Sequence, residues 1–312
     1  MREPEVSVIV PVWNNPEGIG DLLGRLRGQT VSREHFEVVI ADDGSDRPPT
    51  IPVDEDGWLQ SRPGPRLNSY AARNRAVATA RGQVLAFCDS DCLPEPTWLE
   101  RGLAALETAD VVAGEVQFEP PQAPSVWSLL TVDMFLDQER SVRLSRAVTA
   151  NLFIRRSLFD ELGAFDDSLP SGGDYDLVVR AVDRGARLAY APDAVVLHPT
   201  VDEARPFLEK VYETNRCDAY RRARAGLRPE LTGFLLVVPP LAVAHARRKA
   251  LRPIGHLHRG RLRASGIRAS WREDLRALPL VYFPIAIWAG LARVQGWTQG
   301  MRMLRRQPAG AS

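Results

Sequence analysis

The sequence is poor in cysteine and lysine and lacks a long apolar run. Its 312 residues contain three cysteines, Cys88, Cys92 and Cys217, and none of them forms a CxxC pair. Neither a disulfide framework nor a zinc ribbon is therefore expected, and a reducing cytoplasm fits this usage. Only two of the 40 basic residues are lysine, which together with abundant alanine indicates the coding bias of a GC-rich bacterial genome.

A strong net charge is also missing. The formal charge is +1, which argues against a general nucleic-acid binder. The hydrophobic fraction is 45% and the charged fraction 25%, as in an ordinary globular chain rather than a disordered or fibrous one. The first residues form a short apolar run interrupted early by Glu3 and Glu5, so we expect a strand there and no signal peptide.

Up to about His198, apolar and β-branched runs alternate with helical patterns. The expected strands are Val6–Val12, Phe36–Ala41, Val84–Cys88, Val111–Phe118 and Ala194–Leu197. The expected helices are Glu17–Arg27, Tyr70–Ala80, Thr97–Glu107 and Asp174–Arg184. Because apolar strands separated by helices imply parallel crossovers, we predict an α/β, Rossmann-like, mostly parallel sheet flanked by helices. Ligands of such sheets bind beyond the carboxyl ends of the strands.

The character of the chain changes after about residue 203, and we predict two domains, 1–202 and 203–312. The second is expected to be helical and contains two apolar stretches, Thr232–Ala246 and Ala277–Ala292. At 15 and 16 residues, both are shorter than the roughly 20 residues needed to span a bilayer. The segment Arg247–Arg276 between them holds ten Lys/Arg against two acidic residues.

The charge of this arginine-rich segment indicates whether the two apolar stretches cross a membrane or lie on its surface. If both apolar stretches crossed, the arginines would face away from the cytoplasm, against the positive-inside tendency. We therefore expect the C-terminal region to contact the anionic inner face of the cell membrane, with aromatic residues at the interface: Trp271, Tyr282, Trp288 and Trp297. The alternative is a soluble helical subdomain that packs these stretches against the sheet or a second subunit.

Polar residues follow the first two expected strands. Pro11 and Asn14 stand at the end of the first strand, where asparagine tolerates turn geometry and offers an amide. The second strand ends in Asp42 and Asp43, followed by Gly44-Ser45-Asp46. This is either an ordinary turn or a carboxylate that accepts hydrogen bonds from a ribose or a base. Glycines spaced GxGxxxG inside the next helix disfavour a dinucleotide fold.

Three Asp-x-Asp triplets differ in context. Asp54-Glu55-Asp56 lies in a polar loop and is expected to be solvated surface. Asp89-Ser90-Asp91 directly follows a buried strand. Two ionised carboxylates at this position repel each other, and a bound divalent cation would offset that repulsion. Asp174-Tyr175-Asp176 opens a helix, so capping explains at least one of its acids. His198 ends the last apolar run and is either structural or a metal ligand.

The order and spacing of these motifs resemble the family 2 inverting glycosyltransferases of the GT-A fold. The resemblance covers roughly residues 5–200 and rests on the ordered set VSVIVPVWNN, FEVVIADDGSD, AARNRAVATARGQVLAFCDSDC and TANLFIRRSLFDELGAFDDSLPSGGDYDLVVRA. It implies a GT-A-type sheet and a metal-dependent transfer in polysaccharide biosynthesis. The donor would be a UDP-, GDP- or dTDP-sugar, the cofactor Mn²⁺ or Mg²⁺, and the acceptor a glycan or a lipid-linked glycan.

The resemblance also implies roles for single residues. Asp43, with Asp42 beside it, matches the carboxylate that contacts the base, and Pro11 and Asn14 belong to the loop that lines the nucleoside pocket. Arg73 and Asn74 match the nucleotide-side helix motif.

The remaining implied roles concern metal and base. Asp89 and Asp91 match the metal motif, in which the second acid binds the ion directly, and His198 matches the histidine that completes the metal site. Asp174 matches the base that takes the proton of the acceptor hydroxyl during inversion. Arg180, on the same helix, either orients this base, pairs with phosphate or forms a surface salt bridge.

Two departures from the family pattern affect the prediction. Glutamate usually precedes the catalytic aspartate, and here that position is Gly173. The QxxRW signature of processive members is absent, and Asn215-Arg216 occupies the region without reproducing it, so addition of a single sugar is favoured. A non-catalytic carbohydrate-binding or scaffold homologue stays open because of Gly173. A sugar-nucleotide pyrophosphorylase is disfavoured because Trp13-Asn14-Asn15-Pro16-Glu17 is neither glycine-rich nor basic.

Overall fold

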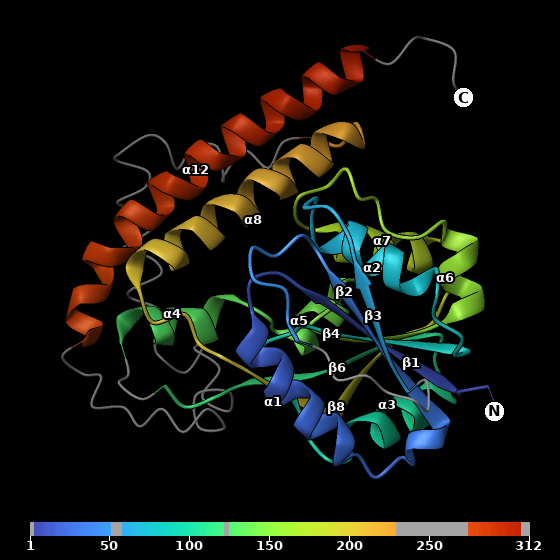
Figure 1. The fold of residues 1–312 in the computed structure, drawn as a ribbon. Coiled ribbons are helices and arrows are strands. Elements are labelled where there is room, and N and C mark those ends of the chain that lie inside the picture. The colour runs from blue at the N-terminus through green and yellow to red at the C-terminus, as the bar shows by residue number, and fades with distance from the viewer. Residues whose placement is uncertain (1–2, 51–57, 122–124, 229–273, 307–312) are drawn as a thin grey trace. The chain divides into compact units, whose positions relative to one another are not determined.

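A computed structural model describes residues 3–50, 58–121, 125–228 and 274–306 (Figure 1). The chain divides into two compact units, one made of Met1–Glu119 and Leu136–Pro199 and the other of Pro120–Phe135 and Thr200–Ser312. The acidic triplet at 54–56, the apolar stretch Thr232–Ala246 and most of the arginine-rich segment lie outside the described residues.

Within the described residues, the first unit is built on one eight-stranded sheet with the order β3-β2-β1-β4-β7-β6-β8-β5. The strands are β1 Val6–Val12, β2 Phe36–Asp42, β3 Leu59–Pro63, β4 Val84–Cys88, β5 Leu93–Pro94, β6 Val111–Phe118, β7 Asn151–Arg155 and β8 Leu188–His198. The pairs β1–β2, β1–β4, β2–β3 and β6–β8 are parallel. The short strand β5 and the inserted strand β7 run antiparallel to their neighbours.

The prediction of a mostly parallel α/β sheet is confirmed, and β1, β4 and β6 coincide with the predicted runs. Strand β8 begins six residues earlier than predicted, and β3, β5 and β7 were not predicted. The predicted helices correspond to α1 Pro16–Arg27, α2 Ser69–Val77, α3 Trp98–Leu106 and α7 Gly173–Asp183, while α5 Gln138–Arg143 and α6 Arg156–Leu162 are additional.

Helices cover both faces of this sheet (Figure 1). On one face, residues of α1 and α3 share a hydrophobic core with alternate residues of β1, including Val8 and Val10. On the other face α2, α6 and α7 pack on Ile9 and on Phe87 of β4. Because β1, β2 and β4 are buried throughout, they read in sequence as continuous apolar runs, which is typical of strands covered on both sides.

The second unit, as described, consists of the helices α4 Val126–Met134, α8 Ala204–Arg224 and α12 Asp274–Arg306. Its core contains Leu130 of α4, Phe207 and Val211 of α8, and Ile285 and Ala289 of α12. The segment Pro120–Phe135 is grouped with this unit, and Leu130 of α4 is buried in its core. None of the helices in the described part of the chain has both the length and the apolarity to cross a membrane.

Helices α8 and α12 approach each other closely. A Cβ atom added to Gly296 would overlap the backbone oxygen of Arg216, and one added to Gly300 would lie 2.6 Å from the Cβ of Ala223. Side chains also join the two helices, since Arg216 Nη1 donates to Gln299 Oε1 over 2.9 Å. The backbones therefore meet at two glycines one helical turn apart.

Candidate functional site

The predicted site residues of the first unit gather where its parallel strands end. Asn14 follows β1, Asp42 ends β2 with Asp43 directly after it, Asp89 follows β4, and His198 ends β8. The parallel pairing of β1 with β2 and β4 brings the first three of these ends to one edge of the sheet. Pro11 is buried within β1, in register with Ala41 of β2.

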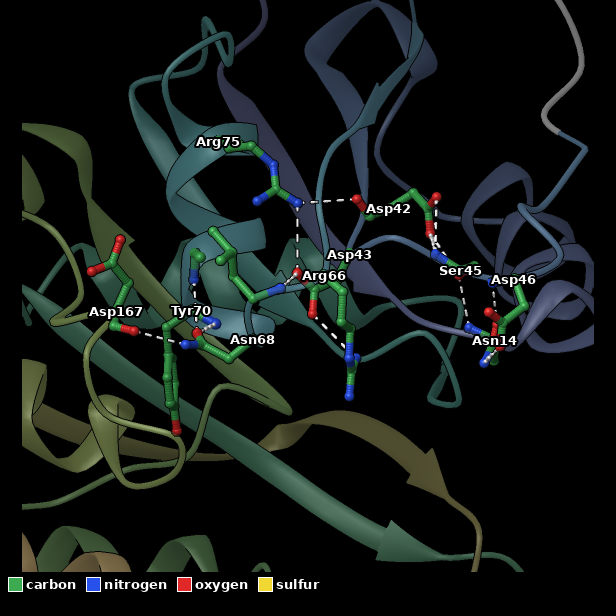
Figure 2. Close-up of polar contacts among 12 residues, drawn as sticks. Asn14, Asp42, Asp43, Ser45, Asp46, Arg66, Asn68, Tyr70, Arg75 and Asp167 are labelled. Atoms are coloured by element: carbon green, nitrogen blue, oxygen red, sulfur yellow. Dashed lines mark hydrogen bonds and ion pairs between the residues drawn. The ribbon is translucent and has the colours of Figure 1, made fainter.

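Asn14 and Asp42 hold the loop between them rather than projecting free side chains (Figure 2). Asn14 adopts a positive φ of 50°. Its amide donates to Asp46 Oδ2 over 3.0 Å and accepts from the Asp46 N–H over 2.8 Å. The carboxylate of Asp42 accepts from the Ser45 hydroxyl over 2.6 Å and from the Ser45 N–H over 3.2 Å. For Asp42 this is the turn that the sequence left as one of two alternatives.

Asp43 is buried and is neutralised by arginine (Figure 2). It accepts from Arg66 Nη1 over 3.2 Å and from the N–H of Leu67 over 3.0 Å, and Arg75 Nη2 lies 3.7 Å away. Gly44, with φ of 73°, permits this arrangement, because a Cβ atom there would lie 2.5 Å from the backbone nitrogen of Arg66.

Arg66 also lies over the indole of Trp13, with its guanidinium carbon 3.5 Å from the ring centroid. The indole is 48% exposed, so an aromatic face, a cation and a buried carboxylate adjoin one another at the ends of β1 and β2. An aromatic face and a carboxylate are the groups that bind a planar base by stacking and by accepting its N–H groups.

The two residues of the nucleotide-side helix motif point to different partners. Arg73 is buried, with its side chain 4% exposed, and forms an ion pair with Asp89. Its Nε atom is buried and has no hydrogen-bond partner among the residues that the structure describes. Asn74 instead ties α2 to the backbone of Phe165, donating to its oxygen over 3.0 Å and accepting from its N–H over 3.1 Å. The structure thus brings Arg73, but not the Asn74 amide, to the acidic triplet.

The two acids of the Asp89-Ser90-Asp91 triplet have different partners. Arg73 supplies the cation beside Asp89, while Asp91 lies near His198, with 3.7 Å between Asp91 Oδ2 and His198 Nε2. His198 Nδ1 lies 2.7 Å from the backbone oxygen of Pro199. Since a carbonyl oxygen only accepts, Nδ1 carries the hydrogen, and Nε2 is the ring nitrogen that faces Asp91.

This arrangement fits a divalent cation. Ligand atoms of Asp91, Cys92 and His198 lie within 4.8 Å of one another. A hydrogen bond with Cys88 and burial raise the pKa of the Cys92 thiol, and sulfur is a poor ligand for Mn²⁺ or Mg²⁺. Asp91 and His198 are therefore the protein groups that would hold such an ion, and phosphate oxygens would complete its oxygen-rich shell.

Asp174 is the second residue of α7 and is held by neighbours on three elements. Its Oδ1 atom accepts from the Tyr175 N–H over 2.9 Å and from the Tyr70 hydroxyl of α2 over 3.3 Å. Its Oδ2 atom accepts from the Thr149 N–H over 3.4 Å. Burial raises the pKa of the Asp174 carboxyl, which the Tyr175 N–H and the charge of Arg73 oppose. A raised pKa makes a carboxylate a stronger base.

The structure explains why the residue before Asp174 is glycine. A Cβ atom on Gly173 would lie 3.0 Å from Cδ2 and Cε2 of the Tyr70 ring, which is closer than carbon atoms ordinarily pack. A side chain at position 173 would therefore require the ring of Tyr70 to shift by a few tenths of an ångström.

Arg180, for which the sequence left three roles open, is structural. It pairs with Asp176 over 2.8 Å and donates to the backbone oxygens of Leu162 and Ala164 at the end of α6. This accounts for the second acid of the Asp174-Tyr175-Asp176 triplet, and no hydrogen bond or ion pair of Arg180 in the described part of the chain reaches Asp174.

Sequence reasoning missed Tyr70, Arg66 and Trp13. Tyr70 stands three residues before Arg73, and one helical turn places it on the same face. The substitution of glycine for glutamate at position 173 was a further signal, since a missing side chain suggests that another group fills its place. Nothing in the sequence near Arg66 indicates its pairing with Asp43, because the contact depends on the path of the loop after β3.

Comparisons with known proteins identify the family of this chain. Residues 7–163 match the model of the family described as Glycosyl transferase family 2. Glycosyltransferase AglE of Haloferax volcanii is 35% identical over 218 residues, which cover 66% of this chain and 69% of that protein. The pre-mycofactocin glycosyltransferase of Mycobacterium tuberculosis is 30% identical over 224 residues, covering 66% of this chain and 45% of that protein.

Among solved structures, the fold is similar to that of a mannosyltransferase from Pyrobaculum calidifontis, PcManGT, determined in complex with GDP-Man and Mn²⁺. The TM-score is 0.58 at 18% sequence identity, over 94% of this chain and 88% of the other. At this identity the likeness establishes the GT-A-type α/β fold.

Proposed function

Because the chain belongs to glycosyl transferase family 2 and is therefore a nucleotide-sugar glycosyltransferase, we propose that it transfers one sugar, with inversion, to a hydroxyl group of a glycan or lipid-linked acceptor. The observation that carries the proposal is the combination of a candidate cation site at the strand ends with a carboxylate at the start of α7. Asp91 and His198 form a candidate cation site. Asp174 is a partly buried carboxylate whose pKa is influenced by both Arg73 and Asp89.

In this proposal Asp174 accepts the proton of the acceptor hydroxyl as that oxygen attacks the anomeric carbon. The raised pKa of Asp174 supports a base, and general base catalysis contributes about 10²–10⁴-fold. The leaving group is a nucleoside diphosphate, so the bond to the sugar breaks as negative charge develops on phosphate. Arg73, buried and with an unpartnered Nε atom, stabilises negative charge on this side of the site.

Asp91 and His198 would hold Mn²⁺ or Mg²⁺, which acts as a Lewis acid on the diphosphate. Asp43, Trp13 and Arg66 would form the nucleoside pocket, with the indole as a stacking face and Asp43 as acceptor. The PcManGT complex with GDP-Man and Mn²⁺ supports this donor and metal class by analogy of fold. We propose that residues 1–202 form the catalytic domain and that residues 203–312 form a helical region.

A donor panel tests the activity. Thermal shift with UDP-glucose, UDP-N-acetylglucosamine, GDP-mannose and dTDP-glucose, each with and without Mn²⁺, should show metal-dependent stabilisation by one nucleotide class. Release of the free nucleoside diphosphate from that donor then measures turnover. Binding without turnover in water or with any glycan acceptor would favour the non-catalytic alternative. Formation of a nucleotide sugar from a sugar phosphate and a nucleoside triphosphate would favour a pyrophosphorylase.

The second unit supports a lipid-linked acceptor at the inner face of the cell membrane. Helix α12 exposes Trp288, Leu291 and Val294, which are spaced three residues apart and therefore share one side of the helix. Exposed Arg302 lies further along the same helix, and cations beside an apolar face suit an anionic membrane surface.

Vesicle flotation tests this contact. The wild-type chain should float with vesicles containing anionic phosphatidylglycerol and be released by high salt, whereas Trp288→Ser/Leu291→Ser should float poorly. Leu144→Ser is a matched control, because Leu144 is an exposed leucine of the first unit. Absence of flotation by the wild type would favour the soluble helical subdomain.

A further inference from the structure

The position of Tyr70 against Gly173 and Asp174 leads to a specific role for that tyrosine, which rests on the function proposed above. Tyr70 belongs to α2 and Asp174 to α7, and the two residues are 104 positions apart in the chain. Their contact is therefore produced by the tertiary fold and not by local structure.

The ring of Tyr70 is fixed on several sides. It is buried, with 6% exposure, and packs against Phe165 with 5.5 Å between ring centroids. Gly173 lies against its edge so closely that a Cβ atom there would be 3.0 Å from two ring carbons. Because the ring fills this space, its position is set by packing.

The hydroxyl of this fixed ring reaches the carboxylate. Tyr70 Oη lies 3.3 Å from Asp174 Oδ1, longer than the 2.7–2.8 Å typical of an O–H···O hydrogen bond. Catalytic hydrogen bonds are often long before substrate binds. Burial and the negative charge of Asp174 raise the pKa of the Tyr70 phenol, so it stays protonated and can only donate to an ionised carboxylate.

We propose that Tyr70 is a positioning residue for Asp174, and that Gly173 permits this by leaving room for the tyrosine ring. The phenol restrains the rotation of the carboxylate and stabilises its ionised form. It does so together with the N–H groups of Tyr175 and Thr149. Tyr70 touches the base and not the reacting atoms, so its effect on transfer is indirect.

The groups that face Asp174 determine in which direction its pKa should move when the Tyr70 hydroxyl is removed. Arg73 of α2 favours the charged carboxylate, as do the N–H groups of Tyr175 and Thr149, while Asp89 and burial disfavour it. Removing the Tyr70 hydroxyl takes away one donor to the charged form. The pKa of Asp174 should then rise, and the acidic limb of the pH profile should move to higher pH.

The experiment compares wild type, Tyr70→Phe and the control Tyr190→Phe. Tyr190 is also partly buried and donates to a carboxylate, that of Glu115, over 2.7 Å. Single-turnover hydrolysis of the nucleotide sugar identified by the donor panel is measured from pH 4.5 to 8. Carbon-13 NMR of labelled aspartate follows the Asp174 carboxyl directly, with Asp174→Asn assigning the signal.

Tyr70→Phe should slow the single-turnover rate about tenfold above the acidic limb, because a carboxylate that can rotate is less often aligned with the hydroxyl or water that it deprotonates. It should also raise the Asp174 pKa in both measurements by about half a unit or more. Tyr190→Phe should change neither. Gly173→Ala keeps every polar group but displaces the ring, and it should shift the pH limb in the same direction.

Two different failures can be told apart. If Asp174→Asn is inactive but Tyr70→Phe keeps the wild-type rate, pH limb and NMR pKa, the role of Tyr70 is refuted and the proposed base stands. If Asp174→Asn retains wild-type turnover, the proposed base is wrong and the role of Tyr70 falls with it. Equal effects of Tyr70→Phe and Tyr190→Phe would mean a general structural loss and would also refute the proposal.

Discussion

Replacing Asp174 with asparagine should remove transfer without unfolding the protein, and the contacts of the carboxylate give the size of both effects. Asparagine keeps an oxygen at the Oδ1 position, where the Tyr175 N–H at 2.9 Å and the Tyr70 hydroxyl at 3.3 Å donate. It loses the acceptor at Oδ2, which the Thr149 N–H reaches only over 3.4 Å. A hydrogen bond this long contributes less than about 1 kcal/mol.

The pH dependence of stability gives a second, independent quantity. Burial places the pKa of Asp174 above its value in the unfolded chain. The carboxyl group therefore contributes stability at low pH, and this contribution is lost as the pH rises through the raised pKa. Asparagine carries no such dependence. The Tm of Asp174→Asn, measured relative to wild type, should thus increase as the pH is raised from 4 to 7.

Activity should fall by about 10²–10⁴-fold, equivalent to about 3–5 kcal/mol of transition-state stabilisation. The assay is release of nucleoside diphosphate, with donor binding checked by thermal shift. Retention of more than about a tenth of wild-type turnover would refute the base. A loss of several kcal/mol of stability at neutral pH would instead mean that the carboxylate is a structural acceptor.

Two further changes test the metal site and the helix pair. Asp91→Ala should abolish the Mn²⁺ dependence of nucleotide binding, as a chelator does in wild type. It should change metal-free stability by less than about 1 kcal/mol, because Asp91 is 42% exposed and 3.7 Å from His198; a clear loss of metal-free stability would make Asp91 structural. Gly296→Ala should destabilise the protein by about 1–3 kcal/mol, because its Cβ would meet the backbone oxygen of Arg216. Gly20→Ala, with no atom within 4 Å of the new Cβ, should stabilise it by up to about 1 kcal/mol in the same thermal unfolding experiment, and equal effects of the two changes would contradict the close packing of α8 and α12.

Strands that are apolar along their whole length could be predicted from the sequence. Strand β7 could not, because its first residue has a polar side chain that is held by residues far away in the sequence. Val6–Val12 and Val84–Cys88 are apolar along their length, so composition alone marks them. Strand β7 begins at buried Asn151, whose side chain accepts from Trp98 Nε1 and donates to the oxygens of Glu115 and Ala194. A polar residue satisfied by three remote groups leaves no periodic pattern in the sequence.

The same distinction applies to the candidate site. The motifs predicted which acids belong to the site, and in the structure Asp91 Oδ2 lies 3.7 Å from His198 Nε2. They could not indicate that Arg73 neutralises Asp89 or that Arg66 neutralises Asp43. Ion pairs of this kind depend on the positions of side chains across loops, which neither spacing nor hydrophobic pattern encodes. The roles of these residues in binding and catalysis stay predictions until the variants are measured.

The fit between Gly173 and the Tyr70 ring constrains how this sequence can diverge. A descendant that acquires glutamate at position 173 first places a side chain where the ring already lies. One that first loses the ring leaves a void beside the glycine and an untethered Asp174. If Tyr70 positions Asp174 as proposed, either order passes through an intermediate with lower activity, and we expect the two positions to change together among relatives. Such paired inheritance would separate lineages with tyrosine and glycine from lineages with a small residue and glutamate.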